Sequence, residues 1–197
     1  MKSYTLKIFL FLILFQSFDC FSQKQEQKRD SIEITQIATD FFSWYILESS
    51  NNSNGECYPI FIQDKNGMTT LDYSKYFKNL IEHSFSDTLV AKEKLSYQVC
   101  IDNLAKVKYS DFLKFDGLDD FESRNCDFTN YYRWTGGQEM FDGYTVTSVK
   151  IDGKKSSVIG YLFDNNYESG GIKINKRAIS VTFIKQNNKW KILDISR

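Results

Sequence analysis

The sequence of 197 residues has one histidine, one proline and no excess of charge of either sign. His83 is the only side chain whose ordinary pKa lies near neutral pH, and no serine or cysteine pattern predicts a nucleophile activated by it. The single proline excludes a collagen-like chain. The 25 basic and 25 acidic residues cancel, which excludes a globally basic nucleic-acid-binding protein.

Metal ligands and cofactor motifs are also scarce. No cysteine has two further Cys or His neighbours at the spacing of zinc ligands. The acidic stretch Asp116–Glu122 lacks the alternating aspartates of a calcium loop, and the pair Gly136-Gly137 is too sparse for a phosphate-binding loop. We therefore predict neither a metal site nor a cofactor, and we interpret the acidic stretch as a solvated loop.

Long hydrophobic runs are absent except at the N-terminus, where Lys2 and Lys7 precede the apolar run Ile8–Phe15. With Cys20 and Ser22 at the −3 and −1 positions, this pattern predicts a signal peptide over residues 1–22. A run of this length is too short for a bilayer core about 30 Å thick. We expect a secreted or periplasmic protein without a transmembrane span in its mature chain; lipid attachment at Cys20 is the alternative.

Three cysteines remain after such processing: Cys57, Cys100 and Cys126. An oxidising compartment favours one disulfide and one spare thiol, and three pairings are open. Cys100 falls on the apolar face of a predicted helix, where a free buried thiol is ordinary. Because Cys57 and Cys126 both fall in predicted loops, we predict that these two form the disulfide.

The remaining chain, with 42% hydrophobic residues, is predicted to form one domain over residues 31–197 after a flexible segment at 23–30. Asp30 and Glu33 resemble a capping box, and apolar residues then recur at helical spacing up to the polar run 49–55. A second helix is predicted from Asp72, and a third, capped by Ser86, extends to about Val107. Residues 59–62 are predicted as a short strand.

The C-terminal part alternates between apolar and polar residues, as β-strands do. Residues 152–154 and 186–189 are predicted hairpin turns, so three or four strands form a meander. This order of helices followed by strands predicts an α+β fold, with N-terminal helices packed on a curved C-terminal antiparallel sheet.

The charge is divided unevenly along the chain: residues 111–142 carry a net charge of −5 and residues 143–197 a net charge of +6. We favour mutual neutralisation of these regions over an interaction surface.

Two segments carry a resemblance to a known superfamily: Phe41–Tyr45 in the first helix, and the ending Val181–Ile195, in which a polar turn precedes Trp-x-Ile and an acid. In these segments and in the order of its elements the chain resembles the nuclear transport factor 2-like superfamily. It also resembles small bacterial envelope proteins catalogued only as a domain of unknown function. The resemblance implies a cone-like fold able to enclose a pocket, but no particular activity.

The residues predicted to bind a ligand or partner are Tyr131, Tyr132, Arg133 and Trp134, because aromatic residues beside an arginine are favoured in protein interfaces. Trp44 and Tyr45 are further candidates. For both groups the alternative is a role in the core.

The leading hypothesis is a non-catalytic binding domain in the cell envelope that contacts a protein, a peptide or a small ligand. Nucleic acid is not an expected partner, and no catalytic residue is assigned. One alternative is an extracytoplasmic enzyme of the cone fold that uses His83 with an aspartate. Another is an immunity protein that neutralises a secreted toxin.

Overall fold

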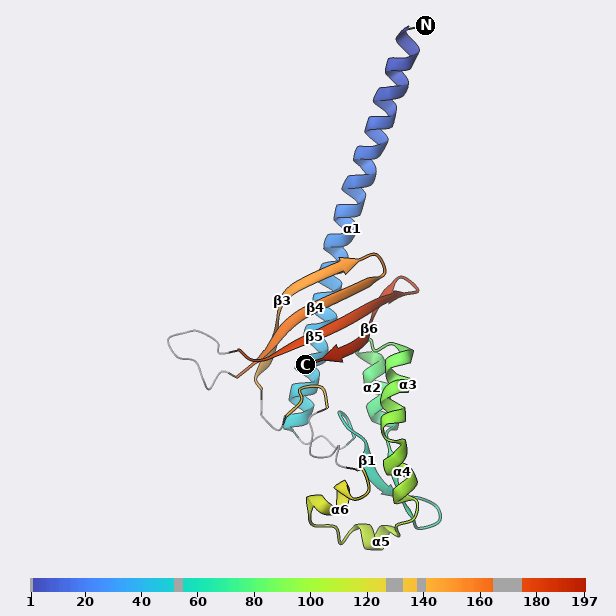
Figure 1. Cartoon of the computed structure of the whole chain (residues 1–197), viewed down its shortest axis with the longest axis vertical. Helices are drawn as coiled ribbons and strands as arrows, with labels where there is room; N and C mark the ends of the chain where they lie inside the picture. The colour runs from blue at the N-terminus through green and yellow to red at the C-terminus, as the bar shows by residue number, and fades with distance from the viewer. Residues whose placement is uncertain (1, 52–54, 127–132, 138–140, 165–174) are drawn as a thin grey trace, which may run out of the picture.

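The computed structural model describes residues 2–51, 55–126, 133–137, 141–164 and 175–197 (Figure 1). Its helices are α1 (Lys2–Ser50), α2 (Ser74–Glu82), α3 (Asp87–Ser96), α4 (Gln98–Leu104), α5 (Tyr109–Phe112) and α6 (Leu118–Glu122). Its strands are β1 (Ile60–Gln63), β2 (Thr69–Asp72), β3 (Gly143–Asp152), β4 (Lys155–Phe163), β5 (Asn175–Gln186) and β6 (Lys189–Ser196).

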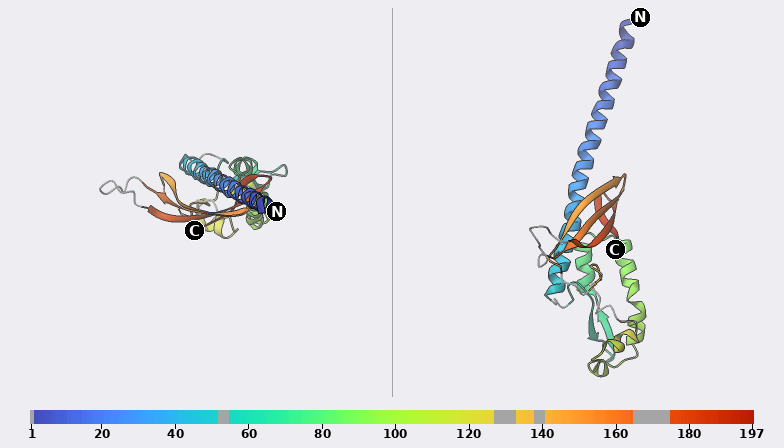
Figure 2. Two further views of the ribbon diagram at one scale, coloured as in Figure 1. Left: turned by 90° about the horizontal axis from the view of Figure 1, so that it is seen from above. Right: turned by 60° about the vertical axis from the view of Figure 1, so that its left-hand side comes forward.

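The fold is α+β, as predicted from the sequence. Strands β3 to β6 form an antiparallel meander in which each strand pairs with the next one along the chain. Helix α1 lies across one face of this curved sheet and contacts mainly β3 (Figure 2). The start of α3 is joined to the edge strand β6, because the N–H of Ser86 donates to the carbonyl of Ile192 at 2.8 Å.

Helix α1 is longer than predicted. The predicted start at Asp30 is wrong, because the helix runs from Lys2 without a break. The physical reason is that no glycine or proline precedes Gly55, and residues 23–29 are mostly Gln, Lys, Glu and Arg, which favour helices. Its end at Ser50 lies in the predicted polar run. Within the described residues, no helix combines the length and the apolar character needed to cross a membrane.

The two predicted hairpin turns are confirmed. Asp152 pairs with Lys155 and Gln186 with Lys189, so both turns have two central residues. Asn187 and Asn188 both have positive φ angles, of 51° and 59°. This conformation matches the right-handed twist of the flanking strands, and asparagine adopts it more readily than most residues.

The predicted third helix is divided in two. Ser86 caps its start as predicted, since its hydroxyl accepts the N–H of Leu89 at 3.2 Å. At Tyr97 the helix is interrupted, and α4 begins at Gln98. The interruption occurs where the hydroxyl of Tyr97 donates to the carboxylate of Glu93 at 2.8 Å, a contact that the sequence pattern does not predict.

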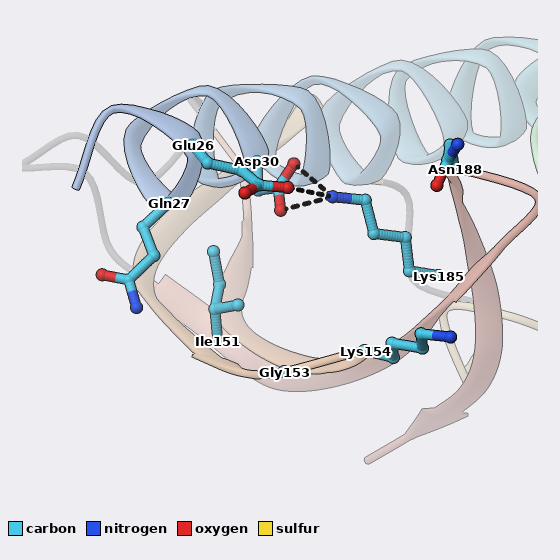
Figure 3. Close-up of a pocket in the computed structure, with 8 residues that line it drawn as sticks. All are labelled: Glu26, Gln27, Asp30, Ile151, Gly153, Lys154, Lys185 and Asn188. Carbon is cyan, nitrogen blue, oxygen red and sulfur yellow. Dashed lines mark hydrogen bonds and ion pairs between the residues drawn. The ribbon is translucent and has the colours of Figure 1, made fainter. Parts of the chain in front are cut away.

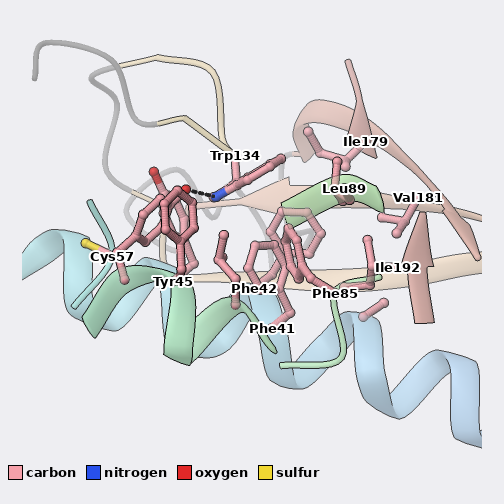
Figure 4. Packing of buried hydrophobic residues seen from close by; sticks show 14 of the residues in the cluster. Phe41, Phe42, Tyr45, Cys57, Phe85, Leu89, Trp134, Ile179, Val181 and Ile192 are labelled. Carbon is pink, nitrogen blue, oxygen red and sulfur yellow. Dashed lines mark hydrogen bonds between the residues drawn. The ribbon is translucent and has the colours of Figure 1, made fainter. Parts of the chain in front are cut away.

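The core lies between α1, the sheet and the segment that leads into α3 (Figure 4). Phe41 and Phe42 of α1 are completely buried, and the ring of Phe41 meets the ring of Phe85 at 4.8 Å, edge to face. The sheet contributes side chains that alternate along each strand, such as Val181 and Phe183 of β5. Burial of large aromatic side chains of this kind is a main source of stability in a domain of this size.

A second, smaller aromatic cluster lies at the other end of the molecule, where β1 meets α5 and α6. Phe61, Phe112, Phe115 and Phe121 contact one another, with ring centroids 4.7 to 6.1 Å apart. The guanidinium of Arg124 lies 4.4 Å from the centroid of Phe115. This cluster holds together short helices that could not be stable alone.

The predicted disulfide is wrong. Cys126 pairs with Cys100, with a Cα–Cα distance of 5.0 Å, and Cys57 is a buried free thiol. The chain after α6 folds back onto α4, where the side chain of Asn103 donates to the carbonyl of Arg124 at 3.0 Å. This packing brings a loop cysteine to the buried face of a helix, so the location of Cys100 on a helix does not prevent pairing.

Candidate functional site

The candidate site centres on the segment that contains Arg133 and Trp134; Tyr131 and Tyr132 lie outside the described residues. Trp134 is only 3% exposed. Its ring packs edge to face on Phe85 at 5.1 Å, and its indole N–H donates to the hydroxyl of Tyr76 at 3.0 Å. Trp134 therefore belongs to the core and fixes one end of this segment to it.

Arg133 is held by Glu93, a residue of α3 whose side chain is fully withdrawn from solvent. The guanidinium Nε lies 2.9 and 3.1 Å from the two carboxylate oxygens, and Nη2 lies 2.8 Å from Oε2. Burial by itself would lower the pKa of Arg133, but the hydrogen bonds and charge of Glu93 outweigh it and raise the pKa. The arginine therefore keeps its charge, and its side chain is still 40% exposed.

Two tyrosines complete the surroundings of Glu93. Tyr97 donates to its Oε1 at 2.8 Å and Tyr76 donates to the same oxygen at 3.1 Å. Burial, together with the negative charge of Glu93, raises the pKa of both tyrosines well above the ordinary value. A buried carboxylate is tolerated only when it is hydrogen-bonded and paired in this way. The sequence contains no signal for this network, because its members come from α2, α3 and a distant loop.

The other predicted binding residues, Trp44 and Tyr45, lie near the C-terminal end of α1. Tyr45 is 2% exposed, and the backbone groups of Trp134 and Arg133 near its hydroxyl lower its pKa and so oppose the effect of burial. Burial raises its pKa far above the ordinary value. The structure thus brings Tyr45 together with the Arg133 segment. Trp44 is half-buried, and its ring contacts that of Tyr45 at 6.2 Å and is stacked on that of His83 at 4.4 Å.

His83 follows α2 and is half-buried between its own helix and α1. Loss of solvent around the imidazole lowers its pKa, and the negative charges of Asp40 and Glu82 oppose this effect. No described carboxylate forms a hydrogen bond with the ring. Within the described ranges, no group of three or more His, Cys, Asp or Glu side chains could hold a metal ion.

The thiol of Cys57 is also not activated as a nucleophile. Burial of its thiol, and next the negative charge of Glu48, raise its pKa to about 12. Thiolates rather than thiols are nucleophiles, so this cysteine is unreactive at neutral pH.

A separate hollow of about 350 Å³ lies between α1 and the two hairpin turns of the sheet (Figure 3). The ammonium of Lys185 lies 2.8 and 3.0 Å from the carboxylate oxygens of Asp30 and 3.4 Å from Glu26. These hydrogen bonds raise the pKa of Lys185. The hollow is otherwise lined by residues of α1 and of both turns: Gln27, Ile151, Gly153, Lys154 and Asn188.

Comparison with known proteins finds no match for this chain, either among the protein-family models or among the curated proteins.

Proposed function

We propose that this chain is an extracytoplasmic, non-catalytic binding domain of the nuclear transport factor 2-like type, and that the loop ending in Arg133 is its contact surface. One observation carries the proposal. Arg133 is fixed in one orientation by the buried carboxylate of Glu93, yet two-fifths of its side chain is open to solvent.

A fixed arginine suits binding because association then costs little side-chain entropy. Its guanidinium lies 5.1 Å from the ring centroid of Trp134, and Trp134 is itself locked in the core. Arginine and aromatic residues are enriched among the residues that dominate binding energy in protein interfaces. In this proposal Arg133 contacts the partner, together with its sequence neighbours Tyr131 and Tyr132.

The disulfide between Cys100 and Cys126 supports a location outside the cytoplasm, because reducing compartments rarely contain stable disulfides. Mass spectrometry of the protein isolated from its own cells tests this part of the proposal. We expect an N-terminus at Gln23. A lipid-modified Cys20 would favour the anchored alternative, and an intact Met1 would contradict export with cleavage.

Contact by the loop is tested with a photo-crosslinking amino acid in place of Tyr132, introduced in living cells. The matched control carries the same amino acid in place of Leu113, which is 66% exposed and belongs to the aromatic cluster region at α5 and α6. We expect a discrete crosslinked species from position 132 and none from position 113. Equal crosslinking at both positions, or none at position 132, contradicts the proposal.

The contribution of the two tyrosines is tested with the double variant Tyr131→Ala/Tyr132→Ala. We expect it to lose capture of the crosslinked partner while its melting temperature stays close to that of the wild type, since the ion pair of Arg133 with Glu93 is untouched. Unchanged capture would count against the loop as the contact surface.

A further inference from the structure

Basic side chains gather at one end of the domain. The hairpin turns between β3 and β4 and between β5 and β6 lie at the end of the sheet from which the N-terminal half of α1 emerges (Figure 1). The hollow lined by α1 and both turns shows that the three segments meet there. We define the basic end by its nine lysine and arginine residues: Lys24, Lys28, Arg29, Lys150, Lys154, Lys155, Lys185, Lys189 and Lys191.

This charge is largely uncompensated. Lys185 is bonded to Asp30 and Glu26, but none of the other eight basic side chains forms an ion pair with a described residue. The acidic side chains at this end are Glu26, Asp30, Glu33 and Asp152, which leaves a net charge of +5.

Among the described residues, no ion pair joins the acidic segment 111–142 to these lysines. Among its described members, Asp111 pairs with Lys114 and Asp120 with Arg124, both within the segment itself. The hairpin lysines Lys150, Lys154, Lys155 and Lys189 are exposed instead. A surface of one sign that is built from exposed lysines attracts anions over roughly 8 Å at physiological salt.

The course of α1 favours a lipid bilayer as the anionic partner of the basic end. Beyond the basic end, α1 continues into the segment that contains the apolar run Ile8–Phe15 and Cys20 (Figure 1). In the precursor, or after lipid attachment at Cys20, this segment would bring the basic end toward a bilayer, and cleavage after Ser22 would leave all nine basic residues in the mature chain. Basic residues next to a membrane-inserting segment bind anionic lipid headgroups, and a basic patch combined with one lipid chain gives stable attachment.

Nucleic acid fits this end less well. Proteins that bind single strands stack bases on exposed aromatic rings. The described aromatic side chain next to Lys189 and Lys191 is Trp190, and it is 1% exposed.

We infer that the basic end is a docking surface for an anionic phospholipid bilayer. It orients the domain with its hairpin turns on the membrane and its aromatic cluster of α5 and α6 pointing away. This inference goes beyond the proposed function and uses none of the residues of the 131–134 loop, so each can fail without the other.

The test measures binding of the chain, expressed with its own N-terminal segment, to lipid vesicles by co-sedimentation. Vesicles of phosphatidylcholine with 30% phosphatidylglycerol are compared with pure phosphatidylcholine vesicles. We expect tighter binding to the anionic vesicles and loss of this preference at 0.5 M salt. Each lysine near the surface contributes about fivefold to the partition coefficient.

The variant Lys154→Glu/Lys155→Glu/Lys189→Glu changes three exposed side chains without touching the core. The matched control, Lys65→Glu/Lys106→Glu/Lys108→Glu, makes the same change of charge at exposed positions away from both turns. We expect loss of the preference for anionic vesicles, by at least about a hundredfold, only in the first variant. Equal binding to both vesicle types, equal loss in both variants, or binding of soluble heparin without binding of anionic vesicles would overturn the inference.

Discussion

The side chains of Glu93 and Arg133 join helix α3 to a loop 40 residues further along the chain, through hydrogen bonds of 2.8 to 3.1 Å. Glu93 is completely buried, so its charge depends on this partner and on the hydroxyls of Tyr76 and Tyr97. The pair therefore couples the stability of the core to the position of the loop that we propose as the contact surface.

Substitution of either Arg133 or Glu93 should lower the stability of the domain, by an amount that depends on which of the two is changed. We expect Arg133→Ala to lower the free energy of unfolding by about 3 kcal/mol, because it leaves a buried carboxylate unpaired. Glu93→Gln should cost less, about 1 kcal/mol, since the amide oxygen can still accept from Tyr97 and the half-exposed Arg133 can reach water. Urea denaturation measures both values.

The control for this experiment is Lys92→Ala, which removes an exposed ion pair of the same helix with Asp194. Exposed pairs contribute little, so we expect a loss below about 1 kcal/mol. If Arg133→Ala were no more costly than Lys92→Ala, the loop would not be tied to Glu93 in solution.

His83 should make the domain less stable in mild acid. Burial lowers its folded-state pKa below the ordinary value of 6.5, so the unfolded chain binds the proton more readily. The contribution is fully present above pH 6.5 and is lost as the pH falls through 6.5 toward the folded-state value. We expect this part of the fall in unfolding free energy to disappear in His83→Gln.

The folded-state titration can be followed directly by proton NMR, because the chain has a single histidine. Asp40→Asn should lower the pKa further, since the negative charge of Asp40 opposes the effect of burial. A midpoint at or above 6.5 in the wild type would contradict the position of the imidazole against Trp44.

The disulfide should be the main covalent support of the region beyond α4. It closes a loop with a sequence separation of 26 residues, for which chain entropy predicts about 3 to 4 kcal/mol of stabilisation. We expect Cys100→Ser/Cys126→Ser to lower the unfolding free energy by this amount, as measured by urea denaturation under non-reducing conditions.

Peptide mapping without reduction checks the connectivity. We expect Cys100 and Cys126 in one linked peptide pair and Cys57 as a free thiol that alkylates at pH 7.5 only after unfolding, because burial raises its pKa to about 12. A linked pair that contains Cys57 would show that the structure assigns the wrong partner.

Gly160 should not tolerate even a methyl group. A Cβ at this position would lie 2.6 Å from the carbonyl oxygen of Thr145 on the paired strand and would overlap the ring of Tyr144. We expect Gly160→Ala to lower the unfolding free energy by about 1 to 3 kcal/mol. Gly117→Ala is the control, since a Cβ at that position would have no other atom within 4 Å, and its effect should stay within about 0.5 kcal/mol.

Much of the fold could be predicted from the sequence because it depends on neighbours in the chain. The alternation in the last third predicts the meander, and the paired asparagines at 187 and 188 predict a tight turn since they tolerate positive φ. The hydroxyl of Ser86 caps a helix start three residues away. In each case the interacting atoms are only a few residues apart, so composition and spacing contain the information.

The sequence alone thus determines the order of the elements and the turns between strands. Tertiary packing decides what those elements bring together: which cysteine Cys126 meets, that Arg133 is paired with Glu93, and that exposed lysines of two hairpins lie beside the exit of α1. The physical reason is that hydrophobic burial is not directional, so many arrangements satisfy the same periodic pattern. Only an arrangement that fills the core and also pairs most of its buried polar groups is stable.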